Sequence, residues 1–181
     1  MIQHLGSIVE TTLISLDGVV DDPMRFALPY FDGDAQADAV ELLDTHDAMV
    51  FGRRTFEALG AAWAGQSGEF ADRINTIPKY VLSSTLREAT WGNSQIVTGD
   101  AVMEVTRLKE RHERGLVTYG HGQLSRTLLA NGLIDIVRFN LHPVVVGGAA
   151  EPLQERASAF TLTSARSRES GVVVLTYRTG A

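Results

Sequence analysis

The stretch AMVFGRRTFEAL (residues 48–59) is an apolar run that ends at a glycine and continues directly into a helical pattern. Its first four residues predict a buried strand, and the apolar spacing after Gly52 predicts a helix over 54–62. The first turn of a helix carries free N–H groups and a partial positive charge. Gly52 lets an anion approach these groups closely, and Arg53 and Arg54 add fixed positive charge. This corner predicts a phosphate site; the alternative is a surface turn with solvated arginines.

Strand and helix patterns alternate along the rest of the sequence. Apolar or β-branched runs predict strands at 8–14, 48–51, 79–82, 94–98, 116–119 and 136–142. Amphipathic patterns predict helices at 35–45 (capped by Asp34), 54–62, 66–75, 100–113 and 123–130. The alternating runs 160–166 and 172–178, separated by Ser170-Gly171, predict an antiparallel C-terminal hairpin. This order predicts an α/β fold with a mostly parallel sheet and an antiparallel edge.

Composition narrows the class of protein. A length of 181 residues favours one domain over 1–181, and the net charge of −6 argues against non-specific nucleic-acid binding. The chain lacks cysteine, which removes disulfides and thiolate chemistry, and its five histidines lack metal-ligand spacing, so we expect no metal. We find neither a signal peptide nor an apolar run long enough to cross a membrane, which fits a cytoplasmic protein.

Three predicted strands end in small or polar turns, at residues 52–55, 83–85 and 120–122. If these strands are parallel, all three turns lie along one edge of the sheet, where open α/β sheets bind ligands. Two helix starts plus hydroxyl groups suit an elongated diphosphate ligand such as a dinucleotide. The usual GxGxxG pattern is absent after Gly120, which reads GHGQLS, and no acid is placed to hold an adenosine ribose. The arginine pair 53–54 instead suggests a phosphorylated ribose, and therefore NADPH over NADH.

A loop over residues 21–33 is rich in aromatic side chains. We expect Phe26, Tyr30 and Phe31 to hold a substrate against the nicotinamide of a cofactor. The alternative is that they form a hydrophobic plug over the core.

Five motifs, in the same order, resemble the dihydrofolate reductase superfamily. They are SLDGVV, DAMVFGRRTFEAL, KYVLSSTL, VTYGHGQLSRTLL and IDIVRFNLHPVVVGGAAEPL, and they span residues 15–153. The last is similar to the branch that contains the reductase (C-terminal) domain of the bacterial riboflavin-biosynthesis deaminase/reductase. The resemblance implies a three-layer fold with helices on both faces of the sheet, and hydride transfer from NADPH to a small heterocycle.

The resemblance also implies roles for particular residues. Cofactor phosphates would be bound by Gly52, Arg53, Arg54 and Thr55, with Ser83 and Ser84 beside the adenosine phosphate. The pyrophosphate and nicotinamide ribose would lie on Gly120, His121, Gly122, Gln123 and Leu124, and the loop of Asp17 and Gly18 would edge the nicotinamide. His121 replaces a smaller residue of the family and could crowd or contact the diphosphate.

The catalytic acid is less well matched. Folate-reducing members place a carboxylate on the first helix, at a position that corresponds here to Gln36. Asp34 and Asp38 flank it, although the first could be only a helix cap and the second a solvated helix residue. Asp17 is the other acid expected near the ring of the substrate.

These observations predict an NADPH-dependent reductase of a pterin-, pyrimidine- or flavin-precursor-like substrate. The alternatives are a non-catalytic nucleotide-binding module of the same fold, and a reductase that uses another phosphorylated reductant such as a deazaflavin. The C-terminal hairpin and an apolar strand expected at 144–146 further suggest a homodimer.

Overall fold

The computed structural model describes residues 6–148, 150, 153–154 and 157–180. Its strands form one eight-stranded sheet in the order β4-β3-β2-β5-β1-β6-β8-β7. The strands are β1 (Ile8–Ser15), β2 (Ala48–Gly52), β3 (Lys79–Leu82), β4 (Ser94–Val97), β5 (Leu116–Tyr119), β6 (Ile136–His142), β7 (Phe160–Ser167) and β8 (Val173–Thr179). The helices are α1 (Met24–Ala27), the 3-10 turn η1 (Leu28–Tyr30), α2 (Gly33–Asp44), α3 (Arg53–Trp63), α4 (Glu69–Thr76), α5 (Ala101–Arg111) and α6 (Gln123–Ala130).

The strands β1 to β6 run parallel to one another, whereas β8 runs antiparallel to both β6 and β7. The predicted mixed sheet with an antiparallel C-terminal hairpin is therefore confirmed. The hairpin turns at Gly171, which has a positive φ of 87° that glycine adopts without strain.

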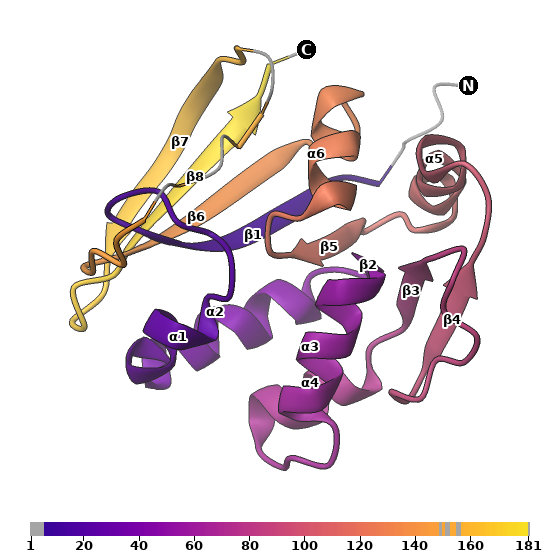
Figure 1. Cartoon of the computed structure of the whole chain (residues 1–181), viewed down its shortest axis with the longest axis horizontal. Helices are drawn as coiled ribbons and strands as arrows, with labels where there is room; N and C mark the ends of the chain where they lie inside the picture. Colours follow the sequence, from indigo (N-terminus) through magenta and orange to yellow (C-terminus); the bar gives the residue numbers. More distant parts are fainter. Residues whose placement is uncertain (1–5, 149, 151–152, 155–156, 181) are drawn as a thin grey trace.

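Helices cover both faces of the sheet, with α1 to α4 on one side and α5 and α6 on the other (Figure 1). The two cores have different composition. Aliphatic residues such as Val50, Leu108 and Leu128 fill the α5–α6 face, whereas the aromatic residues Phe51 and Phe56 pack on the opposite face. Val50 and Phe51 are sequence neighbours, so β2 is buried on both sides, as expected for a central parallel strand.

Two glycines fix how β1 lies against β5 at their amino ends. A side-chain carbon on Gly6 would lie 1.9 Å from the carbonyl oxygen of His112, and one on Gly115 would lie 2.1 Å from that of Ser7. Neither position has room for a larger residue. The close approach sets the register in which Ile8 pairs with Leu116.

The chain changes direction across the sheet at β5. From β2 it proceeds outward to β3 and β4, and it then returns to place β5 between β2 and β1. The connection from β5 to β6 crosses the opposite face from that of α2 to α4 (Figure 1). This is the switch point at which open α/β sheets bind ligands, beyond the carboxyl ends of the strands.

Three local expectations were wrong. The segment 21–33 contains α1 and η1 rather than only loop. The cap of α2 is Asp32, whose carboxylate accepts a hydrogen bond from the backbone N–H of Ala35 at 2.9 Å, so Asp34 lies inside the first turn. The run 144–146 is not a strand, because its backbone groups bond to the loop that follows β1, including a 2.8 Å bond from the N–H of Leu16 to the carbonyl of Val144.

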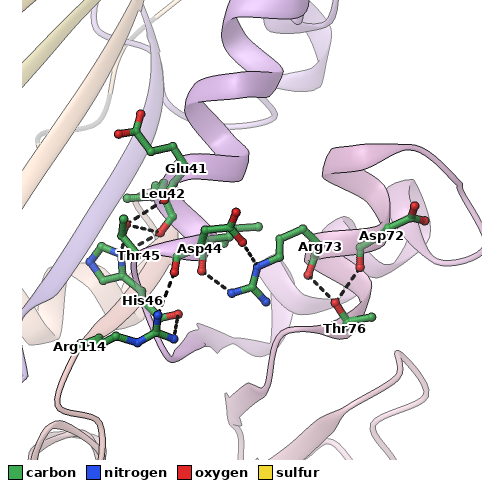
Figure 2. Close-up of polar contacts among 10 residues, drawn as sticks. Glu41, Leu42, Asp44, Thr45, His46, Asp72, Arg73, Thr76 and Arg114 are labelled. Atoms are coloured by element: carbon green, nitrogen blue, oxygen red, sulfur yellow. Dashed lines mark hydrogen bonds and ion pairs between the residues drawn. The ribbon is translucent and has the colours of Figure 1, made fainter.

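At the amino-terminal ends of the strands, opposite the switch point, a group of polar contacts surrounds the C-terminal end of α2 (Figure 2). Arg73 donates to the carboxylate of Asp44 at 2.5 Å, and Arg114 donates to the backbone carbonyl of Asp44 at 3.0 Å. The imidazole Nδ1 of His46 donates to the carbonyl of Leu42 at 2.8 Å. Arg114 and His46 thus satisfy carbonyls that the end of a helix leaves free, and the positive charges of Arg73 and Arg114 suit the negative end of its dipole.

Within the described residues, no helix combines the length and apolar character needed to cross a membrane.

Candidate functional site

The three turns predicted from the sequence lie together at the carboxyl edge of the sheet. A side-chain carbon on Gly52 would lie 3.6 Å from Cβ of Leu124, so the turn after β2 adjoins the first turn of α6. Arg53 donates to the hydroxyl of Thr85 at 3.2 Å, which links the turn after β2 to the turn after β3. The edge therefore presents one continuous polar strip.

Two helices begin at this strip without the capping or acidic side chains that occupy the N-termini of other helices. Asp32 caps α2 and Asp100 caps α5, and α4 has acids in its first turn. By contrast, α3 begins after Gly52 and α6 after Gly122, and neither has a capping side chain or an acid in its first turn. Their first N–H groups are free to bind an anion, which both helix dipoles favour.

Arginines flank the open end of α3. The side chain of Arg53 bonds to Thr85 and lies 3.8 Å from the carboxylate of Glu57, a weak contact between two exposed groups. Arg54 is exposed, and it makes no hydrogen bond or ion pair with any residue that the structure describes. Thr55 follows within the first turn. The corner offers an exposed positive charge beside unused backbone donors.

The other cofactor positions have distinct environments. The hydroxyl of Ser83 accepts hydrogen bonds from the N–H groups of Thr85 and Leu86, which shapes the turn, and Ser84 is exposed. A side-chain carbon on Gly120 or Gly122 would meet nothing within 4 Å, so the backbone before α6 faces open space. Gln123 is exposed at the start of α6.

His121 does not point into this space. Its imidazole is buried, with Nδ1 2.7 Å from Oε1 of Glu10 and Nε2 2.6 Å from the carbonyl of Leu153. Burial alone would lower the pKa of His121, but the hydrogen bond and charge of Glu10 raise it above its usual value. With both nitrogens occupied, the ring is unsuited to contact a diphosphate, and only the backbone of His121 remains available for that role.

Asp17 is tied to the segment that follows β6. Its carboxylate accepts hydrogen bonds from the hydroxyl of Ser15 at 2.6 Å and from the N–H groups of Val146 and Gly147 at 3.1 and 2.8 Å. These bonds lower the pKa of Asp17 to about 2. The adjacent Gly18 has a positive φ of 85°. Asp17 therefore positions the loop after β1 and is unsuited to donate a proton near neutral pH.

Asp38 is also engaged. Arg166 and Arg168 each donate to its carboxylate at 2.6 Å, and this side chain is 12% exposed. Burial alone would raise the pKa of Asp38, but the hydrogen bonds from Arg168 and Arg166 hold it below its usual value. Asp34 is exposed in the first turn of α2. None of the three predicted acids combines a buried position with a free carboxyl group.

The aromatic residues expected to hold a substrate divide into two groups. Phe26 and Tyr30 meet the ring of His142 edge-on, at centroid distances of 5.4 and 5.5 Å. Phe31 instead packs against Trp63 and Phe70 in the core beneath α3 and α4. The position of Phe31 matches the alternative of a hydrophobic plug over the core. Tyr30, by contrast, is only half-buried beside the end of β6.

Sequence reasoning missed several polar residues of the interior. Arg138 and Asn140 lie on the same face of β6, and the amide of Asn140 donates to the hydroxyl of Thr11 at 3.1 Å. Their spacing of two residues in IVRFNLH was the available signal, because alternate strand residues share a face. Glu10 was likewise visible as a charge within a β-branched run.

A family model described as the RibD C-terminal domain matches residues 7–175 of the chain. The Bacillus subtilis (strain 168) protein YyaP, itself described as uncharacterized, is 28% identical over 147 residues, which cover 76% of each chain. A putative riboflavin biosynthesis protein from Shewanella sp. PV-4 has a similar structure, with a TM-score of 0.76, 21% identity, and coverage of 97% of this chain and 99% of the other.

Dihydrofolate reductase from Enterococcus faecalis, solved in a complex with NADP(H), has the same fold at a greater distance. Its TM-score is 0.61 at 15% identity, with 98% of each chain covered. These similarities confirm the dihydrofolate-reductase-like fold that the sequence motifs implied.

Proposed function

Because the chain belongs to the RibD C-terminal domain family, we propose that it is an NADPH-dependent reductase of a small heterocycle of the pterin, pyrimidine or flavin-precursor kind. The observation that carries the proposal is the pair of adjacent, uncapped and acid-free helix starts of α3 and α6 at the switch point of the sheet. When bound, NADPH supplies the hydride, and the protein supplies binding and orientation.

The residues at this edge fit such a cofactor. The open N-terminus of α3, with Arg53 and Arg54, suits the phosphate on the adenosine ribose. The turn from Gly120 to Gly122 presents unobstructed backbone to a diphosphate, at the start of α6. Gly18, held in place through Asp17, would border the nicotinamide.

The substrate would lie on the α2 side of β1, next to the half-buried ring of Tyr30. Because Asp17 and Asp38 are held as carboxylates, we propose that the proton that completes the reduction comes from an ordered water. The chain would then contribute positioning and charge rather than a protonated acid.

Fluorescence titration with NADPH and NADH tests the cofactor assignment. We expect NADPH to bind more tightly, and the double variant Arg53→Ala, Arg54→Ala to weaken NADPH binding about tenfold to a hundredfold with little effect on NADH. The double variant Arg111→Ala, Arg178→Ala removes the same charge from exposed positions elsewhere and serves as the control.

Absence of binding by either nucleotide would overturn the reductase proposal. Unchanged NADPH affinity in the Arg53, Arg54 variant would refute the phosphate site and favour another phosphorylated reductant, such as a deazaflavin.

A second candidate is a nucleotide-binding module without catalysis. It is favoured by one observation, namely that no predicted acid offers a buried, free carboxyl group. Tight NADPH binding without NADPH oxidation across a panel of pterins, pyrimidines and quinones would support the module, whereas turnover of any of these would exclude it.

A further inference from the structure

A cavity of about 180 Å³ lies between α6 and the strands β6 and β7, on the face of the sheet that α6 covers. Its walls are apolar, with Leu129 from α6, Val137 and Phe139 from β6, and Phe160 from β7. Val137 and Phe139 share this face because alternate residues of a strand point the same way. A cavity of about 150 Å³ admits benzene. The space is therefore sufficient for a single six-membered ring with one small substituent.

The segment between β6 and β7 forms one side of this cavity. Leu153 and Gln154 line it, and the amide of Gln154 donates to the backbone carbonyl of Arg126 on α6 at 3.2 Å. Ser158 lines the same side and is exposed, which gives a ligand access from solvent. Among the described residues that line the cavity, only His121 belongs to the proposed cofactor turns. The cavity is therefore separate from the edge of the sheet where NADPH is proposed to bind.

The polar end of the cavity is the side chain of Glu10, which is fully buried. Its Oε1 atom accepts hydrogen bonds from Nδ1 of His121 at 2.7 Å and from the hydroxyl of Thr12 at 3.0 Å. Its Oε2 atom is also buried, yet it accepts no hydrogen bond within the part of the chain that the structure describes. A buried carboxylate oxygen without a donor is costly. A molecule that fills the cavity should therefore bring a donor, which a pure hydrocarbon would lack.

The charge of Glu10 is already balanced by His121. The two ring nitrogens of His121 face the carboxylate of Glu10 and the carbonyl of Leu153, and an imidazole can donate to both acceptors only when it is protonated. The positive charge of Arg126 also acts on His121. Because positive charge is present on both of these side chains, a cationic ligand is disfavoured and a neutral donor suits Oε2 best.

We propose that this cavity binds a small neutral molecule, one ring in size, that donates an O–H or N–H group to Oε2 of Glu10. One-ring phenols and aryl amines belong to this class. The ring would contact Phe139 and Phe160, which aromatic molecules do favourably. Neither the proposed reductase chemistry nor nucleotide binding uses this site. It adjoins the cofactor turn through His121, which shares the carboxylate of Glu10 with the proposed ligand.

Nuclear magnetic resonance titration of the isotopically labelled, nucleotide-free protein tests the site with four probes. Phenol and aniline are neutral donors, toluene has the same shape without a donor, and benzylamine is a cation at neutral pH. We expect phenol or aniline to bind and to shift the amide signals of Leu129, Val137 and Phe139. Toluene should bind at least tenfold more weakly, because it leaves Oε2 without a hydrogen bond.

Two variants locate the binding. Leu129→Phe places a ring inside the cavity and should weaken every probe at least tenfold. Leu162→Phe makes the same change at an exposed position on β7 and should leave binding unchanged. Glu10→Gln keeps the shape of the side chain but replaces one acceptor with an amide donor, so it should weaken phenol about tenfold and leave toluene unchanged. If Glu10→Gln does not fold, Leu129→Phe still decides the location.

Several results would overturn the proposal. Phenol and toluene bound equally would show that Oε2 takes no part, and benzylamine bound more tightly than phenol would refute the neutral class. Binding that survives Leu129→Phe, or signal shifts confined to the cofactor turns, would place the ligand elsewhere. The absence of binding by phenol and aniline would refute the site itself. Because no nucleotide is present in these titrations, none of these results bears on the reductase proposal, which the NADPH titration tests.

Discussion

The imidazole of His121 lies 2.7 Å from the carboxylate of Glu10, and both side chains are buried on the face of the sheet that α6 covers. The hydroxyl of Thr12 donates to the same carboxylate oxygen at 3.0 Å. This pair joins the central strand β1 to the turn that precedes α6. The orientation of the cofactor turn therefore depends on a polar contact on the far side of the sheet.

Removing the carboxylate should destabilise the protein strongly. Glu10→Ala leaves His121 buried without its counter-ion, and we expect a loss of about 3 kcal/mol or more in the free energy of unfolding. Denaturant unfolding measures this loss, with the exposed Glu113→Ala as the control. Equal stability of the two variants would contradict a structural role for the pair.

The same pair should make stability depend on pH. The pKa of His121 is raised in the folded protein, so its stabilising contribution is complete below the unfolded value of about 6.5 and is lost as the pH rises through the folded value. The difference in unfolding free energy between the wild type and His121→Gln should therefore shrink above neutral pH. The other histidines are common to both proteins, so a difference that does not vary with pH would refute the assignment.

Asp17 should govern the acid limb of the stability curve. Its pKa is lowered to about 2, so its contribution is present above the unfolded value of 3.8 and disappears as the pH falls toward 2. Asp17→Asn should be less stable than the wild type at pH 5 and equally stable near pH 2. The exposed Asp21→Asn should match the wild type throughout this range in the same unfolding measurement.

Asp38 and Asp34 lie one helical turn apart and should respond very differently to amidation. Asp38→Asn leaves Arg166 and the buried Arg168 without their shared carboxylate, and we expect a loss of about 3 kcal/mol. Asp34→Asn changes an exposed side chain and should alter stability by less than about 0.5 kcal/mol. If urea unfolding gave similar losses for both variants, the ion pairs would not be the cause.

Arg73 provides a way to lower stability without touching the proposed site. Arg73→Ala removes the bonds to Asp44 and to the carbonyl of Leu43 at the edge of the sheet opposite the cofactor turns. We expect a loss of about 1 to 2 kcal/mol and an unchanged NADPH affinity. A large loss of affinity in this variant would show that global stability, rather than local contacts, controls cofactor binding.

The sequence was most informative where structure is determined locally. The turns after β2, β3 and β5 were found because an apolar run, a glycine or serine, and a helical pattern follow one another within a few residues. Gly52 and Gly122 are now seen to begin the two uncapped helices. Parallel pairing then placed the turns side by side, as the alternation of elements had predicted.

Contacts between distant parts of the chain could not be read in this way. Asp38 meets Arg166 and Arg168 across about 130 residues of sequence, and no local pattern distinguishes such a carboxylate from a solvated one. The cap of α2 was misplaced for a different reason: Asp32 and Asp34 are both good caps, and the choice depends on where the chain enters the helix.

The strand β1 contributes to buried polar contacts on both faces of the sheet: Glu10 faces α6, and its neighbour Thr11 faces α2. Its starting point is fixed by the close contacts of Gly6 and Gly115. A single residue inserted between Gly6 and Glu10 would turn every following side chain of β1 to the other face and place a carboxylate beneath α2. A substitution would alter only one face. The length of this segment is therefore constrained in its own right, because a change of length alters both faces of the sheet at once.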